Sequence, residues 1–191
     1  MVLRRSAPVF LAAALSACAA NQAPSSPALP SLVLVDTAGA TTRLPEDLSR
    51  SKLTVVVFYA DHCPCFRVHE ARLRELSRDV APRGVHVLLV DSEISGSVER
   101  DGRAVAERGL PAITLDPGAR LADALGADYA TFSVVLDGAG RVRYRGGIDS
   151  DKERLHEDTT AYLRDALEDL LSGREPRVPE GKALGCALQK R

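Results

Sequence analysis

The chain has 191 residues, of which 45% are hydrophobic, so we expect one folded domain with extensions rather than two domains. With 25 basic and 26 acidic residues the net charge is -1, which argues against the broad basic surface that nucleic acid requires. Trp is absent and aromatic residues make up 4% of the chain, which disfavours base stacking and carbohydrate platforms. We therefore expect proteins or small molecules as partners, and no nucleic acid.

The first residues predict export. Arg4 and Arg5 precede an apolar stretch over residues 9–15 that is far shorter than a membrane-spanning helix, so residues 1–17 are a predicted signal peptide. Leu15-Ser16-Ala17-Cys18 resembles the lipobox of bacterial lipoproteins, which implies that Cys18 is lipidated. The alternative is a signal peptide without lipid, cut at a small-residue site. We expect a cell-envelope protein that is lipid-anchored to a membrane and faces the periplasm.

Residues 18–30 are small, polar and Pro-rich after Cys18, and they predict a flexible tether. A folded domain is expected over residues 31–175, and it begins with a hairpin of residues 32–35 and 41–44 around a Gly-bearing turn. The β-branched and aromatic run over residues 53–59 predicts a central strand buried on both faces. After Cys63 the apolar residues recur at helical spacing, which predicts a helix that ends at Pro82 and Gly84.

The second half alternates between strands and helices. Residues 85–90 and 112–115 are predicted strands that flank a helical stretch ending at Gly109, as in a parallel βαβ unit. A short helix over 119–125 leads to a second hairpin of residues 132–136 and 142–144. An amphipathic helix is predicted over 158–172, and a tail over 176–191 carries Cys186.

Three segments resemble the thioredoxin-like redoxins. Phe58-Tyr59-Ala60-Asp61-His62-Cys63 matches their lead-in from a strand to a nucleophilic Cys, while residues 137–149 and Leu184-Gly185-Cys186 look like a peroxiredoxin-like subgroup of the AhpC/TSA type. The resemblance implies an α/β protein with the thioredoxin-like fold, in which helices flank a central mixed β-sheet. The first hairpin would be an N-terminal extension of that sheet.

Cys63 is the predicted nucleophile because it stands where a buried strand becomes a helix. Unpaired N–H groups and the positive end of the helix dipole stabilise a thiolate there. Pro64 suits the first helical turn, where no N–H is required, and shapes the site rather than reacting. His62 is a supporting candidate, either as a cation or as a proton acceptor, unless it is a solvated loop residue.

The partner of Cys63 is left open by the sequence. If Cys18 carries lipid, three thiols remain, Cys63, Cys65 and Cys186, and such an odd number favours chemistry over a static staple. Cys65 is separated from Cys63 by Pro64 alone, so their disulfide would be strained. Cys186 would be the resolving thiol if the tail folds back over the site, and a structural or unpaired thiol otherwise.

The sequence departs from the thioredoxins and the peroxiredoxins at positions that concern substrate binding. Thr131 stands where thioredoxins place a cis-proline opposite the nucleophile. Ala60 and Val56 stand where peroxiredoxins carry a Thr and a Pro, and the Thr binds the peroxide. The expected function is therefore thiol-disulfide exchange or a peroxide-linked, antioxidant redox role, with an unidentified electron donor and no organic cofactor.

Two other functions compete with this one. Cys63, Cys65, His62 and His69 lie within eight residues and could bind copper or zinc for delivery. Against that, we expect His69 on an exposed helix face and His86 in the core of a strand. The third possibility is a non-catalytic domain that keeps the redoxin fold for interaction.

Overall fold

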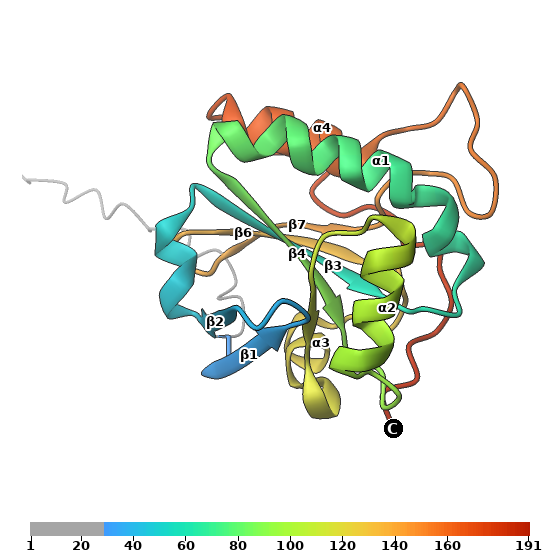
Figure 1. The fold of residues 1–191 in the computed structure, drawn as a ribbon. Helices are drawn as coiled ribbons and strands as arrows, with labels where there is room; N and C mark the ends of the chain where they lie inside the picture. Colours follow the sequence, from blue (N-terminus) through green and yellow to red (C-terminus); the bar gives the residue numbers. More distant parts are fainter. Residues whose placement is uncertain (1–28) are drawn as a thin grey trace, which may run out of the picture.

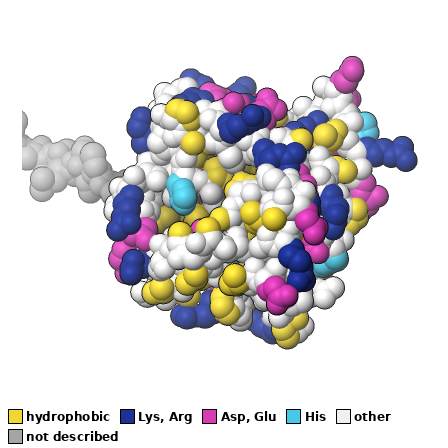
Figure 2. Space-filling model, in the orientation of Figure 1, with side chains coloured by type: hydrophobic (Ala, Val, Ile, Leu, Met, Phe, Trp, Pro, Cys, Tyr) yellow, Lys and Arg dark blue, Asp and Glu magenta, His cyan; other side chains and the backbone are white. Residues whose placement is uncertain are grey.

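The computed structural model describes residues 29–191. The predicted signal peptide, Cys18 and nearly all of the predicted tether lie outside the described residues, so those assignments stay predictions. Within the described part of the chain, no helix has both the length and the apolar character needed to cross a membrane. Basic and acidic side chains are interspersed on the face seen in Figure 2.

A seven-stranded mixed sheet forms the centre of the fold, with strand order β2-β1-β5-β4-β3-β6-β7 (Figure 1). β3, β4 and β5 run parallel, and the remaining neighbours pair antiparallel. The β1-β2 hairpin extends the sheet beyond β5, which confirms the predicted thioredoxin-like fold with its N-terminal hairpin. The strands are β1 (Leu32–Asp36), β2 (Thr41–Leu44), β3 (Leu53–Tyr59), β4 (Val85–Asp91), β5 (Ile113–Leu115), β6 (Ser133–Asp137) and β7 (Val142–Gly146).

β3 is the central strand, as its sequence predicts. All seven of its residues are buried, and it pairs with β4 on one side and β6 on the other. The run Val55-Val56-Val57 suits this position because β-branched side chains pack well on a pleated surface that is covered on both faces. The strand therefore ends deep inside the protein at Tyr59, four residues before Cys63.

Four helices surround the sheet in the described residues: α1 (Pro64–Val80), α2 (Val98–Arg108), α3 (Arg120–Leu125) and α4 (Tyr162–Leu171). Figure 1 shows α1 and α4 side by side on one face of the sheet and α3 on the other side. Ion pairs of Arg164 with Asp79 (3.0 Å) and of Arg83 with Glu168 join the α1 and α4 regions. The apolar stripes of both helices face the sheet, which is the pattern expected of amphipathic helices.

Three predictions from the sequence need correction. α4 begins at Tyr162 rather than at residue 158, because residues 149–160 form a loop in which Asp151 accepts hydrogen bonds from the backbone N–H of His156 and the hydroxyl of Thr159. His69 lies in the core and not on an exposed face of α1. His86 is exposed and lines an open pocket of about 450 Å³ beside the β1-β2 hairpin.

Candidate active site

Cys63 stands at the junction between β3 and α1 and caps the helix. Its backbone is extended, and its Sγ accepts a hydrogen bond from the N–H of Phe66 at 3.4 Å. The side chain that accepts a hydrogen bond at the N-cap of a helix is normally that of Ser, Thr, Asp or Asn. Here the Cys63 sulfur takes that place and faces the free N–H groups of the first turn. Pro64 occupies the first helical position, as predicted. The helix start therefore favours negative charge on the Cys63 sulfur.

The C-terminal tail passes this junction and pairs with the loop before β6 through an isolated β-bridge. The N–H of Ala130 donates to the carbonyl of Cys186 at 2.9 Å, and the N–H of Leu188 donates to the carbonyl of Asp128 at 2.9 Å. Tyr129 and Ala187 form an antiparallel bridge between these two hydrogen bonds. The loop from Asp128 to Ala130 thus pairs with the tail through its backbone, and this pairing fixes where Cys186 lies.

Glycines allow the tail to approach so closely. A Cβ on Gly185 would lie 1.8 Å from the carbonyl oxygen of Ala130, and a Cβ on Gly146 would lie 2.2 Å from the oxygen of Gly181. A Cβ on Gly147 would meet the oxygen of Lys182 at 2.5 Å. Real Cβ atoms do not approach oxygen at such distances, so these positions require glycine for close backbone contact.

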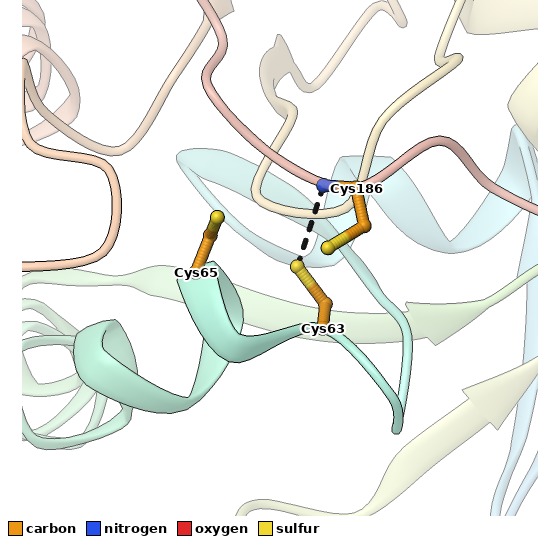
Figure 3. Close-up of side chains that lie close together, drawn as sticks. All are labelled: Cys63, Cys65 and Cys186. Atoms are coloured by element: carbon orange, nitrogen blue, oxygen red, sulfur yellow. Dashed lines mark hydrogen bonds between the residues drawn. The ribbon is translucent and has the colours of Figure 1, made fainter.

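The tail brings a third sulfur to the two on α1. The sulfurs of Cys63, Cys65 and Cys186 all lie within 4.8 Å of one another, and none is in a disulfide (Figure 3). The N–H of Cys186 donates to Cys63 Sγ at 3.4 Å, so that sulfur accepts two backbone N–H groups. Figure 3 shows the Cys63 and Cys186 sulfurs turned toward each other. Cys63 and Cys65 are buried beneath the tail, whereas Cys186 is partly exposed.

The environment makes two of the three thiols, Cys65 and Cys186, weaker acids. Burial, and the proximity of Cys63, raise the pKa of the Cys186 thiol to about 12. The same two causes raise the pKa of Cys65. These two thiols stay protonated at neutral pH, whereas Cys63 holds the two N–H donors that stabilise a thiolate.

His62 and His69 do not join the sulfurs. His62 is half-exposed, and its Nδ1 lies 3.4 Å from a carboxylate oxygen of Glu93. Glu93 also accepts the N–H of Gln189 at 3.1 Å, so it connects His62 to the end of the tail. His69 Nδ1 bonds the carbonyl of Cys65, and its Nε2 bonds Asp149 at 2.9 Å. Both ring nitrogens of His69 are therefore occupied, which removes it as a metal ligand.

Asp149 and Asp151 anchor the loop beside α1, a role that their charged surroundings in the sequence did not reveal. Both are buried, and Arg72 reaches Asp149 at 2.6 Å and Asp151 at 2.9 Å. Burial opposes the imidazolium form of His69, but its hydrogen bonds to Asp149 and to the carbonyl of Cys65, together with the charge of Asp149, outweigh burial and raise its pKa. Because His69 also holds the carbonyl of Cys65, this network fixes the first turn of α1 under the thiols.

Thr131 faces the tail at the place predicted for a substrate-binding residue. Its N–H donates to the carbonyl of Phe58 at 2.9 Å, and its hydroxyl donates to the carbonyl of Leu184 at 3.3 Å. Its φ of 74° lies in the left-handed region, which is rare for a β-branched residue. The hydrogen bonds of Thr131 to Phe58 and Leu184 hold this conformation, in which its hydroxyl contacts the tail.

Comparison with known proteins gives a family and several structural relatives. The Redoxin family model matches residues 20–163. An uncharacterized conserved protein from Geobacillus kaustophilus superposes with a TM-score of 0.78 at 26% identity over 90% of this chain and 94% of its own. A search of the curated proteins finds no match.

Two further solved structures share the fold at lower identity. The pneumococcal exposed lipoprotein thioredoxin Etrx1 from Streptococcus pneumoniae aligns at 19% identity over 75% of this chain and 99% of its own, with a TM-score of 0.54. Peroxidoxin BcpB from Mycobacterium tuberculosis aligns at 17% identity over 63% and 82%, with a TM-score of 0.53.

The glycine contact at the tail is open to a direct test. Gly185→Ala places a Cβ against the carbonyl of Ala130, and an overlap of this kind costs about 1–3 kcal/mol. We expect the tail to detach more often, so that N-ethylmaleimide alkylates Cys186 about tenfold faster or more, measured by mass spectrometry. Gly102→Ala in α2, where a Cβ meets nothing within 4 Å, is the control. Equal rates in Gly185→Ala and wild type would contradict the close docking of the tail.

Proposed function

This chain belongs to the Redoxin family, and from that premise we propose that it is a thiol-disulfide oxidoreductase in which Cys63 attacks and Cys186 resolves. The observation that carries the proposal is the meeting of these two sulfurs, within 4.8 Å, through backbone pairing of the tail. Membership of the family establishes a redox role. The particular reaction and its residues are our inference.

The exchange proceeds in two balanced steps. The Cys63 thiolate attacks one sulfur of a substrate disulfide, which forms a mixed disulfide and releases the other substrate sulfur as a thiolate. Cys186 then loses its proton and attacks Cys63 Sγ, which releases the second substrate sulfur and forms the Cys63–Cys186 disulfide. The substrate gains two electrons and, on protonation, two protons, and the protein loses them. An external dithiol restores the reduced protein, and in the reverse direction the same steps oxidise a substrate.

Cys186 suits the resolving role better than Cys65. Cys65 stands two residues after Cys63 at the beginning of α1, so a disulfide between them would have to form within one helical turn. A disulfide requires a specific dihedral angle and specific Cβ positions, which this rigid turn resists. Cys186 lies on the tail segment that pairs with the loop from Asp128 to Ala130, so its disulfide with Cys63 would not have to close within the first turn of α1.

A disulfide is the favoured substrate over a peroxide. Ala60 is fully buried and carries no hydroxyl at the place where peroxiredoxins bind the peroxide through Thr. The loop from Asp128 to Ala130, in contrast, pairs with an extended segment that presents a cysteine to Cys63. A protein disulfide or thiol is therefore the partner that we propose.

Trapping experiments separate the roles of the three cysteines. With Cys186→Ser, a model disulfide should leave a stable mixed disulfide on Cys63, because the resolving thiol is missing. Cys63→Ser should abolish turnover, and Cys65→Ser should keep it and yield the Cys63–Cys186 disulfide in peptide mass maps. Hydrogen peroxide is offered in parallel. A Cys63–Cys65 disulfide in wild type, faster oxidation by peroxide, or the absence of any turnover would each contradict the proposal.

The second step should depend steeply on pH. Burial, the largest cause of the raised pKa of Cys186, persists in the mixed disulfide, so the thiolate fraction of Cys186 is small at neutral pH and grows as pH rises. We expect the rate of mixed-disulfide resolution, measured in single turnovers by stopped flow, to rise about tenfold per pH unit between about pH 7 and pH 9. In Cys186→Ser, resolution by added dithiothreitol should instead follow the pKa of that reagent. A wild-type rate that levels off below about pH 9 would contradict burial of the attacking thiol.

We propose that the protein acts in the cell envelope through a lipid on Cys18. The lipobox-like residues before Cys18 support this location, and the structural relative from Streptococcus pneumoniae is itself described as an exposed lipoprotein. Cells grown with a labelled fatty acid should incorporate the label into wild type and into Cys186→Ser, and Cys18→Ser should lose both the label and the membrane association. Labelled Cys18→Ser, or unlabelled wild type, would overturn the anchor.

A further inference from the structure

The cluster has three thiols, and one disulfide uses only two of them. Cys63 and Cys186 suffice for the proposed exchange, yet Cys65 is also buried and its sulfur lies within 4.8 Å of both. Among residues 29–191, these three cysteines are the group of potential metal ligands that converges on one point. We propose that the reduced cluster binds one Cu(I) ion through three thiolates.

The geometry requires only a small contraction. A metal–sulfur bond of about 2.3 Å in a trigonal arrangement places the three sulfurs about 4 Å apart. The observed limit of 4.8 Å therefore has to shrink by less than about 1 Å. Two of the sulfurs stand on the fixed first turn of α1, and the third stands on the tail, which can move toward them.

The ligand set favours a soft ion of low coordination number. Thiolates select Cu(I), whereas structural zinc sites are almost always completed to four protein ligands. No histidine joins the three sulfurs in the described residues: His62 is half-exposed beside Glu93, and both ring nitrogens of His69 are bonded, to Asp149 and to the carbonyl of Cys65. This differs from the copper or zinc site suggested by the sequence, which used Cys63, Cys65 and a histidine, because the tail supplies Cys186 in place of the imidazole.

The surroundings also suit a bound ion. The tail buries Cys63 and Cys65, which keeps water from becoming a fourth ligand. The N–H groups of Phe66 and Cys186 point at Cys63 Sγ and offset part of the negative charge that three thiolates bring.

Metal and disulfide exclude each other at this site. Formation of the Cys63–Cys186 disulfide by a substrate disulfide removes two electrons and two ligands from the cluster. One sulfur, on Cys65, would remain, and Cu(I) would be released. The site therefore holds copper only in the reduced protein, so this inference extends the proposed exchange while its metal chemistry can be tested without it.

The test uses the full-length reduced protein without oxygen, titrated with Cu(I) against the chelator bicinchoninate. We expect about one equivalent per chain, with ultraviolet thiolate-to-copper absorption and X-ray absorption showing three sulfur neighbours. Cys65→Ser and Cys186→Ser should each weaken binding at least about tenfold. His62→Gln and Cys18→Ser should bind as wild type does.

Cys65→Ser separates this inference from the proposed function, because it should lose tight copper binding but keep disulfide exchange. Undiminished copper affinity in Cys65→Ser, nitrogen in the coordination shell, or binding of Zn(II) with Cu(I) excluded would overturn the copper site and leave the exchange intact. Loss of exchange in Cys65→Ser with copper still bound would contradict both assignments.

Discussion

The close backbone contact between Gly185 and Ala130 is the constraint on which the site depends. No side chain fits between them, since a Cβ on Gly185 would lie 1.8 Å from the Ala130 oxygen. That contact sets the register in which the tail pairs with the loop at Asp128–Ala130, and so it determines that Cys186, and no neighbouring residue, meets Cys63. The same pairing delivers the N–H of Cys186 to Cys63 Sγ and covers the helix start. The burial of Cys63 and the position of the Cys186 sulfur thus share one cause.

The rest of the fold keeps the other side of the site still. β3 is buried along its whole length and ends just before Cys63, so the reactive turn begins from a rigid strand. On α1, His69 holds the carbonyl of Cys65 and is itself held by the buried Asp149, which also pairs with Arg72. A buried ion pair of this kind is costly to break because one charge would be left without a partner. The buried strand and this network therefore anchor the turn that carries Cys63 and Cys65.

Much of the fold could be predicted because its signals are local. The run at residues 53–59 and the Gly-bearing turns of both hairpins depend on neighbours in the chain, and the structure has them where expected. The position of Cys63 at a strand-to-helix junction follows from the same pattern. The errors concern long-range partners. Asp149 appears in the sequence as one charge among many, and only the fold shows that it pairs with His69, eighty residues earlier. His69 was therefore misplaced on the surface, although its spacing from Phe66 and Leu73 fits the buried stripe of α1.

The glycine positions are a signal in the sequence from which close contact between the tail and the rest of the domain could have been predicted. Gly146 and Gly147 stand far along the chain from Gly185, and each of the three needs the absence of a side chain for backbone contact. A Cβ on Gly181 would instead lie 2.7 Å from the hydroxyl of Tyr144. Glycines in two separate segments are what a docked tail requires, but periodicity cannot show that the segments meet. Once they meet, the contact itself places the Cys186 sulfur within 4.8 Å of Cys63. The same placement leaves Cys65, the third thiol, beside Cys63 and Cys186, the pair for which we propose a disulfide. A buried thiol beside such a pair adds a third soft ligand to the reduced state and none to the disulfide, so redox state and metal affinity become properties of one cluster.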